Sequence, residues 1–388
     1  MSLKFNLITT DGNARRGAVE TAHGTFQTPA FMAVGTAATV KALTMDQVRA
    51  TGTEVILGNT YHLMMRPGGD LVEKMGGLHK FSGWHGPILT DSGGFQVMSL
   101  SNLVKMKEEG VEFTSHIDGG IKHFLRPEDS VHIQHQLDSN ITMVLDECLK
   151  LPTTRARAEK NVDMVTRWAA RSKNAFVDRP GYGIFGIVQG ADFPDLREKS
   201  ARELTAIGFD GYAIGGLAVG EPQSVMFDMI SVVAPILPTD RPRYLMGVGT
   251  PLDILGAVER GVDMFDCVMP TRAGRTAMAF TRHGTMNMRN AKYRDDDAPL
   301  DDKCGCPACK LSRAYLHHLI KCNEILGATL LTGHNLWFYQ DLMRDIRESI
   351  EQGRFAEFKA EFIKNYTEKK LDKVKCCDIM TTKGHDYE

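Results

Sequence analysis

Three aspartates in this sequence, Asp91, Asp146 and Asp266, each follow a short apolar run and precede small or polar residues. This pattern predicts carboxylates at the ends of buried strands. One such carboxylate could attack an electrophilic carbon. A single aspartate in this setting more often caps a turn. Three buried carboxylates on one face repel one another and cost stability, so their joint occurrence favours a functional site.

The residues that follow Asp266 add positive charge to this site. Pro270 ends the strand, and Arg272 and Arg275 come directly after it. Guanidinium groups beside a nucleophilic carboxylate could hold a phosphate. The stretch therefore predicts a carboxylate nucleophile next to a phosphate-binding group.

Three cysteines, Cys304, Cys306 and Cys309, fall within six residues and predict a metal site. A closed tetrahedral site needs a fourth ligand, for which His317, His318 and His334 are candidates. We favour His334, because we expect it to begin a helix on a distant segment and so to join two parts of the chain. Four protein ligands leave no open position. We therefore expect one structural Zn²⁺ ion.

Eight short apolar runs could position these groups, and most of them alternate with helical patterns. Each run ends in or is followed by Gly, Asp, Asn or Gln, and the runs span 31–34, 54–57, 87–90, 141–145, 183–188, 212–214, 243–246 and 263–266. This number and alternation of strands and helices predict an α/β fold of the (β/α)8 TIM-barrel type, in which the catalytic residues lie at the strand ends. A doubly wound open sheet is the alternative, but it would not need polar ends on all eight strands.

The rest of the chain predicts additions to this barrel. Residues 1–29 read as an antiparallel lead-in, and residues 111–125 read as a hairpin. Helices are expected at 312–319 and 322–331, with a separate long helix from His334 onward. We predict a barrel domain of residues 1–285 and 335–366, a zinc-binding C-terminal subdomain at 286–334, and a flexible tail at 367–388.

Composition limits the class of protein. The 388 residues are 43% hydrophobic and 24% charged, with a net charge of −2, so any nucleic-acid surface must be a local patch. The chain starts without a secretory signal and has no apolar run of membrane-spanning length, so we expect no membrane. Clustered cysteines in such a chain indicate metal binding in a reducing cytoplasm.

Several motifs occur together and in order: the runs 91–96, 146–148, 186–190, 215–220, 244–249 and 266–272, and then the three cysteines and His334. Together they closely resemble the tRNA-guanine transglycosylases, the queuine tRNA-ribosyltransferase family, over roughly residues 3–366. The resemblance implies a (β/α)8 barrel with a zinc-bearing insertion. It also implies exchange of guanine at the wobble position of tRNAs with GUN anticodons for a deazaguanine, in queuosine biosynthesis.

The resemblance also implies a role for each site residue. Asp266 matches the nucleophile that attacks C1′ of the ribose, and Asp91 matches the carboxylate that transfers protons to and from the purine. Arg272 and Arg275 match positions that contact the anticodon loop of tRNA. The matching base-binding positions are Asp91, Phe95, Asp146, Gln189, Gly216, Leu217 and Met246.

Val219 and Cys148 follow the bacterial pattern of the family. They favour 7-aminomethyl-7-deazaguanine (preQ1) over queuine, because Val219 would crowd the larger substituent. We expect the homodimer that this family usually forms. The sequence departs from the family at Phe95, where many bacterial members have tyrosine, and in the segment 149–152.

Two other functions fit part of the pattern. A catalytically silent tRNA-binding partner subunit should lack the acidic residues, yet Asp91, Asp146 and Asp266 are all present. A barrel glycosidase acting on free sugars fits three carboxylates at strand ends. It does not fit the cysteine cluster or the arginines.

Overall fold

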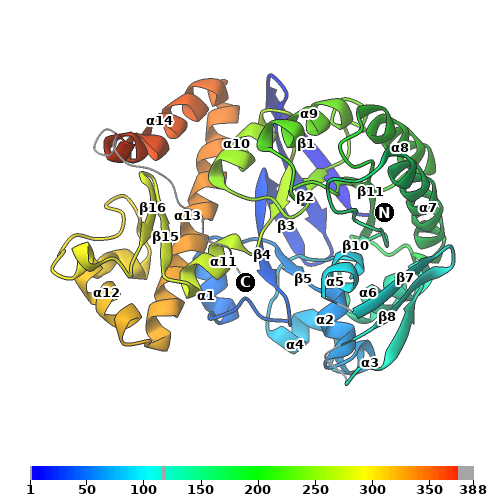
Figure 1. Ribbon diagram of the computed structural model, residues 1–388, viewed down its shortest axis with the longest axis horizontal. Coiled ribbons are helices and arrows are strands. Elements are labelled where there is room, and N and C mark those ends of the chain that lie inside the picture. The colour runs from blue at the N-terminus through cyan, green and yellow to red at the C-terminus, as the bar shows by residue number, and fades with distance from the viewer. Residues whose placement is uncertain (1, 101, 116–118, 375–388) are drawn as a thin grey trace.

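The computed structural model describes residues 2–100, 102–115 and 119–374 and contains a closed barrel of eight parallel strands (Figure 1). These strands are β4 (Ala30–Gly35), β5 (Ile56–Gly58), β6 (Ile88–Thr90), β10 (Ile141–Met143), β11 (Gly183–Val188), β12 (Gly211–Ile214), β13 (Arg243–Leu245) and β14 (Met264–Asp266). Each of the eight predicted runs supplies one strand, so the predicted α/β barrel is confirmed and the open sheet is wrong. Several strands are shorter than predicted, since β5, β6 and β14 begin later and β10 and β13 end earlier.

Helices surround the barrel, and successive helices from α6 to α10 pack on one another (Figure 1). In chain order the helices up to that point are α1 (Met45–Ala50), α2 (Thr60–Met65), α3 (Gly69–Lys74), α4 (Gly77–Ser82), α5 (Gly94–Leu100), α6 (Pro127–Gln136), α7 (Arg155–Ala175), α8 (Pro194–Ile207), α9 (Gln223–Val233) and α10 (Pro251–Val258). Local sequence sets several of their ends. Thr44 and Thr250 each accept a hydrogen bond from a first-turn backbone N–H, which caps α1 and α10.

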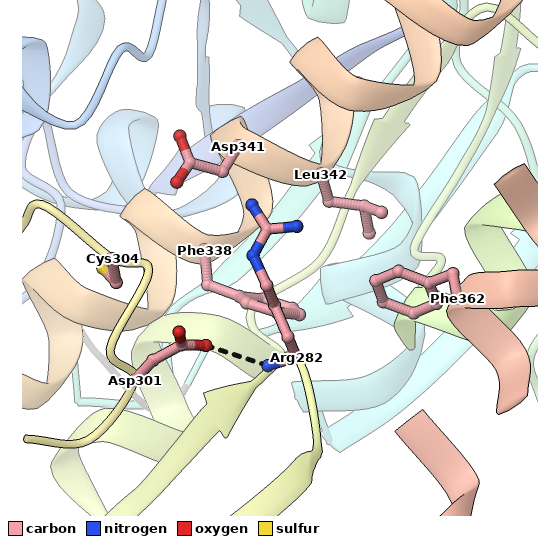
Figure 2. A pocket seen from close by; sticks show the side chains of 7 residues that line it. All are labelled: Arg282, Asp301, Cys304, Phe338, Asp341, Leu342 and Phe362. Atoms are coloured by element: carbon pink, nitrogen blue, oxygen red, sulfur yellow. Dashed lines mark hydrogen bonds between the residues drawn. The ribbon is translucent and has the colours of Figure 1, made fainter. Parts of the chain in front are cut away.

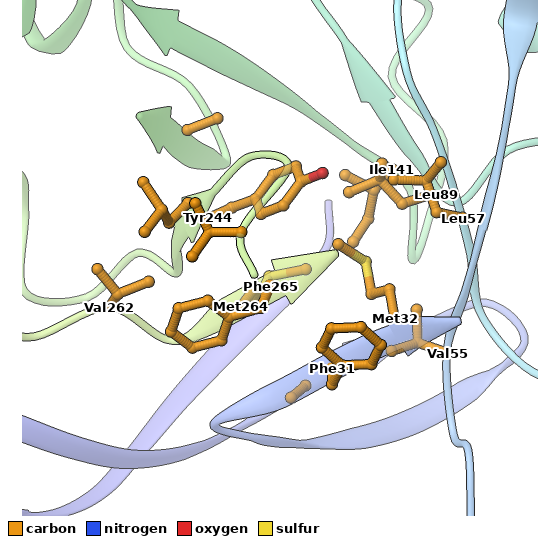
Figure 3. Packing of buried hydrophobic residues seen from close by; sticks show 14 of the residues in the cluster. Phe31, Met32, Val55, Leu57, Leu89, Ile141, Tyr244, Val262, Met264 and Phe265 are labelled. Atoms are coloured by element: carbon orange, nitrogen blue, oxygen red, sulfur yellow. The ribbon is translucent and has the colours of Figure 1, made fainter. Parts of the chain in front are cut away.

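The last strand of the barrel pairs with the first. Residues of β14 lie beside those of β4, with Phe265 opposite Phe31 and Asp266 opposite Met32. Around this seam Phe31, Met32 and Phe265 are buried against side chains from neighbouring strands, including Leu89 (Figure 3). Each such side chain stabilises the fold by about 1.5–3 kcal/mol. The core therefore holds the strand ends at fixed positions.

A three-stranded antiparallel sheet, β1 (Lys4–Asp11), β2 (Ala14–Thr21) and β3 (Gly24–Thr28), covers the amino ends of the barrel strands. The N–H of Leu3 donates to the carbonyl of Tyr182, just before β11, and that of Ala30 donates to Asp263, just before β14. This confirms the predicted lead-in. The sheet closes the end of the barrel opposite the three aspartates.

The predicted hairpin belongs to a second sheet of three strands, β7 (Asn102–Lys107), β8 (Gly110–Thr114) and β9 (Lys122–Leu125). The pairing of β8 with β9 confirms the hairpin, and residues 116–118 of its predicted turn lie outside the described residues. The sequence reading missed β7.

The C-terminal third contains α11 (Met269–Arg275), a hairpin of β15 (Met278–Thr281) and β16 (Gly284–Asn287), α12 (Arg313–Lys321), α13 (Ile325–Glu351) and α14 (Phe355–Val374). Around the cysteines, the hairpin and α12 form a lobe with its own buried cluster that includes Met288, Leu316 and Leu331. Helix α13 stands between this lobe and the barrel (Figure 1).

One expectation about this region is wrong. Helix α13 runs without a break from Ile325, so His334 lies within it and does not begin a separate helix. A mid-helix glycine such as Gly333 costs about 1 kcal/mol relative to alanine, and packing of α13 against α11, β4 and β15 offsets that cost. Helix α14 continues to Val374, within the tail predicted at 367–388, which stays a prediction. Residues 375–388 lie outside the described residues.

Within the described residues no helix is long and apolar enough to cross a membrane. The division into domains stays a prediction, and α13 passes through the boundary predicted between residues 334 and 335.

Candidate active site and metal centre

The three aspartates lie at the carboxyl ends of three barrel strands. Asp266 is the last residue of β14, Asp91 directly follows β6, and Asp146 comes three residues after the end of β10. Carboxyl ends of parallel strands open on one face of a barrel. Repulsion from the carboxylates of Asp266 and Asp146 helps to raise the pKa of Asp91, as expected for three carboxyl groups that lie near one another.

Asp91 is buried and fully engaged in hydrogen bonds. Its Oδ2 accepts from the Asn59 side chain at 2.6 Å, and its Oδ1 accepts from the N–H groups of Thr60 at 3.0 Å and Gly93 at 3.1 Å. Burial raises the pKa of Asp91 from 3.8 to about 7, and repulsion from Asp266 and Asp146 adds to the rise. A carboxyl with this pKa can both give and take a proton near neutral pH.

Asp146 faces a buried amide. The Gln189 Nε2 atom donates to its Oδ2 at 2.7 Å, and the Ser92 hydroxyl donates to its Oδ1 at 3.4 Å. Burial raises the pKa of Asp146 to about 6, although both hydrogen bonds oppose the rise. The carboxylate and the amide together offer acceptors and donors to the edge of a flat ligand.

Asp266 uses one oxygen for support. Its Oδ1 accepts from the Tyr244 hydroxyl at 2.5 Å and from the Gly247 N–H at 2.8 Å. Within the described residues no hydrogen bond is recorded to Oδ2. Burial raises the pKa of Asp266, and the two donors lower it. Both donors therefore contact Oδ1 and leave Oδ2 without a donor among the described residues.

The strand ends of β11 and β12 bring Gln189, Gly216 and Leu217 together. Gly216 has φ +61°, and a Cβ at this position would overlap the Gln189 amide oxygen. Glycine is required here for both reasons. The backbone of residues 215–217 is thus free to approach a flat ligand closely.

The remaining predicted residues lie on segments that follow barrel strands. Phe95, in the first turn of α5, is 50% exposed, and Met246 is half-buried just after β13. Arg272 is exposed and Arg275 half-buried in the last turn of α11, a helix that the sequence reading did not predict. Burial and the charge of Arg272 lower the pKa of Arg275, which indicates that the two cations lie close together.

Cys304, Cys306, Cys309 and His334 form a group that could hold a metal ion. The Nδ1 atom of His334 lies 3.7, 3.4 and 3.4 Å from the three sulfur atoms in turn. Zinc bonds of about 2.3 Å to sulfur and about 2.0–2.1 Å to nitrogen at tetrahedral angles require separations of about 3.6 Å. The other ring nitrogen, Nε2, is 2.7 Å from the carbonyl of Phe280, a contact that would orient a ligating imidazole. The residues therefore fit the metal.

The other histidine candidates lie elsewhere. The His317 ring contacts the carbonyl of Met288 at 2.7 Å, and His318 faces Cys322 at the surface. A second group of potential ligands, His23, His79 and Asp138, does not suit an ion as it stands. The two rings are stacked 3.5 Å apart, so their nitrogen lone pairs cannot converge on one point, and Asp138 already accepts hydrogen bonds from Arg179 and Tyr182.

A small pocket lies beside Cys304, and none of Asp91, Asp146 and Asp266 lines it. Arg282, Asp301, Phe338 and Asp341 line it, and its volume is about 10 Å³ (Figure 2). This is room for about one water molecule, so it cannot hold a purine.

Sequence reasoning missed the residues that support the aspartates. Tyr244 and Asn59 donate to Asp266 and Asp91, and the buried Arg197 braces the loop that contains Gly216. Asn59 at a polar strand end carried a usable signal. Tyr244 within an apolar run and Arg197 within a helix carried none.

Comparison with known proteins finds one family along most of the chain. The family model described as queuine tRNA-ribosyltransferase matches residues 10–368. A queuine tRNA-ribosyltransferase of Granulibacter bethesdensis is 61% identical over 92% of this chain and 94% of its own. Those of Rhizobium meliloti and Zymomonas mobilis are 57% and 56% identical, over 94% and 93% of this chain and 97% and 95% of their own.

Proposed function

This chain belongs to the queuine tRNA-ribosyltransferase family, and we propose that it is a tRNA-guanine transglycosylase acting in queuosine biosynthesis. It exchanges guanine at the wobble position of tRNAs with GUN anticodons for preQ1. The observation that carries the proposal is the meeting of Asp91, Asp146 and Asp266 on one barrel face. The enzyme is a pentosyltransferase.

In the first half-reaction, Oδ2 of Asp266 attacks C1′ of the ribose. The bond from C1′ to the purine nitrogen breaks, and its electron pair leaves with guanine, which takes a proton from Asp91. Asp91 suits this step because burial raises its pKa to about 7. The product is a covalent bond between C1′ and Asp266, as in a retaining glycosidase.

In the second half-reaction, the incoming preQ1 gives its ring N–H proton to Asp91. The freed nitrogen attacks C1′, and the Asp266 carboxylate leaves with the electrons of the broken C–O bond. Tyr244 and Gly247 donate to Oδ1 throughout and so stabilise the departing carboxylate.

The site recognises the base by hydrogen bonds whose donors and acceptors complement those on the edge of the purine. Asp146 accepts from adjacent N–H groups of the purine, and Gln189 with the backbone of Gly216 and Leu217 contacts its other polar atoms. Phe95 and Met246 lie on the faces of the ring. The half-buried Val219 follows this loop and leaves room for an aminomethyl group in preference to a cyclopentenediol.

Further parts of the proposal concern partners and metal. Arg272 and Arg275 contact the phosphates of the anticodon loop. One zinc ion, held by the three cysteines and His334, supplies structural cross-linking of the lobe. A homodimer and a cytoplasmic location complete the proposal, which family membership supports.

The test is guanine exchange by Asp266→Asn. Labelled guanine enters tRNA with the unchanged chain, and a covalent protein–tRNA species survives in a denaturing gel. Both signals should vanish in Asp266→Asn, while tRNA binding persists. Asp240→Asn, at a side chain that is 70% exposed, is the matched control and should behave normally. Exchange retained in Asp266→Asn would exclude it as nucleophile.

A silent tRNA-binding partner subunit is the second candidate. Tight tRNA binding by the unchanged chain with no exchange of guanine would favour it.

A further inference from the structure

Arg197 is a fully buried cation beside the proposed base-binding loop. It lies in the first turn of α8, and its side chain reaches across the ends of β11 and β12. The guanidinium donates to four backbone carbonyls: Val188 at 3.2 Å, Ala191 at 2.8 Å, Gly215 at 2.6 Å and Gly216 at 2.9 Å. One side chain thus fixes the strand ends that hold Gln189, Gly216 and Leu217.

This arrangement is costly for a purely structural contact. Within the described residues Arg197 forms no ion pair, and burial lowers its pKa to about 10, only partly opposed by charges such as Glu221. Burying a charge without a paired counter-ion destabilises a fold unless hydrogen bonds compensate. All four recorded hydrogen bonds end on carbonyls next to the proposed base site.

The direction of these bonds orients two peptide groups. A peptide is planar, and its C=O and N–H point in opposite directions. The carbonyl of Gly215 points at Arg197, so the N–H of Gly216 points away from it, and the carbonyl of Gly216 sets the N–H of Leu217 in the same way. Both N–H groups therefore point away from Arg197. A Cβ on Gly216 would overlap the Gln189 amide, which donates to Asp146, so this loop lies against the proposed base-binding side chains.

We propose that Arg197 is a positioning residue for base recognition, which aims the N–H groups of Gly216 and Leu217 at the carbonyl oxygen of a 6-oxopurine. The cation behind these peptides also strengthens them as donors. Their dipoles then stabilise the negative charge that a leaving purine develops. This inference rests on the proposed function and names the part of the base that the loop reads.

The test measures the affinity of two Arg197 variants for two free bases. Arg197→Lys keeps the charge but loses the planar fork, and Arg197→Gln keeps a donor but loses the charge. Arg15→Lys is the matched control. Arg15 is also buried and donates to the carbonyls of Thr239 and Arg241, both at 3.0 Å, at the opposite end of the barrel. The probes are guanine and 2-aminopurine, which lacks the 6-oxo group and also the N1 proton. The change in affinity on mutation is compared for each base by titration without tRNA.

We expect Arg197→Lys and Arg197→Gln to weaken guanine binding by about 30-fold and 2-aminopurine binding by less than about 3-fold. In the exchange assay, KM for guanine rises while KM for tRNA stays the same. Arg15→Lys changes neither affinity, although it lowers the melting temperature as the Arg197 variants do.

Equal losses for the two bases, or unchanged guanine binding, would overturn the inference and leave Arg197 a structural brace. An unchanged chain that binds guanine yet exchanges none into tRNA would refute the proposed function, and the binding cycle would still decide the role of Arg197. An unchanged chain that fails to bind guanine overturns both.

Discussion

Replacing Asp91 with asparagine should stabilise the protein above neutral pH while it abolishes exchange. Burial raises the pKa of Asp91 from 3.8 to about 7, so the folded state resists ionisation of this carboxyl. The corresponding contribution to stability is complete below about pH 4 and is lost as the pH rises through about 7. A shift of about three units corresponds to about 4 kcal/mol.

Asparagine does not recover all of this energy. Its oxygen can keep the bonds from Thr60 and Gly93, but its NH₂ group would face the Asn59 NH₂ that now donates to Oδ2. Leaving that donor without an acceptor costs about 2 kcal/mol. We therefore expect Asp91→Asn to be more stable than the unchanged chain by about 2 kcal/mol at pH 8, and about equal to it at pH 5.

The assay is urea unfolding of both proteins at intervals from pH 5 to pH 8, with zinc present throughout. In a chain of this size the gain at pH 8 raises the melting temperature by about 2 to 3 °C. Titration of the metal centre affects both proteins equally and cancels in the difference. Asp240→Asn, at an exposed carboxylate, should show no pH-dependent difference. If the stability difference for Asp91→Asn is the same at every pH, Asp91 does not titrate in this range and the reasoning fails.

Two further variants test the metal centre and the base loop. His334→Ala should lower the zinc content measured by elemental analysis and reduce thermal stability, because three cysteines alone leave one coordination position open. The control His318→Ala, at an exposed histidine, should keep its zinc. Gly216→Ala should raise KM for guanine by about tenfold or more, because the new Cβ would displace the Gln189 amide. The control is Gly12→Ala. Gly12 has a similar φ of +57° and open space around it, so this variant should leave KM for guanine unchanged. Normal zinc content in the first case, or equal KM values in the second, would contradict these assignments.

The barrel and its acidic face could be predicted from the sequence because local signals and global topology agree. Short apolar runs that end in polar residues give parallel strands whose carboxyl ends share one face. Asp91, Asp146 and Asp266 followed from that rule alone. The three cysteines gave the metal group, since their spacing needs no tertiary information.

The supporting contacts could not be predicted in this way, because they join residues far apart in sequence. Tyr244 occupies a strand position that looks like core, and only the barrel geometry brings its hydroxyl to Asp266. Helix α13 was split wrongly at Gly333 because the cost of a mid-helix glycine is visible in the sequence and the compensating packing is not. The close approach of α11 to α13, where a Cβ on Gly274 would overlap Thr332, is equally hidden.

The seam between β4 and β14 has a consequence for how the enzyme is made. Asp266 is the last residue of β14 and lies opposite Met32 of β4. The first and last strands of the barrel must therefore pair before the proposed nucleophile reaches its final environment. A ribosome-bound chain that has not yet released residues beyond 266 cannot close this ring. Helix α13 also contacts the first barrel strand, β4, where the Gln340 amide donates a hydrogen bond to the carbonyl of Phe31. A nascent fragment is thus unable to attack tRNA, and the protein acquires its chemistry only once synthesis is nearly finished.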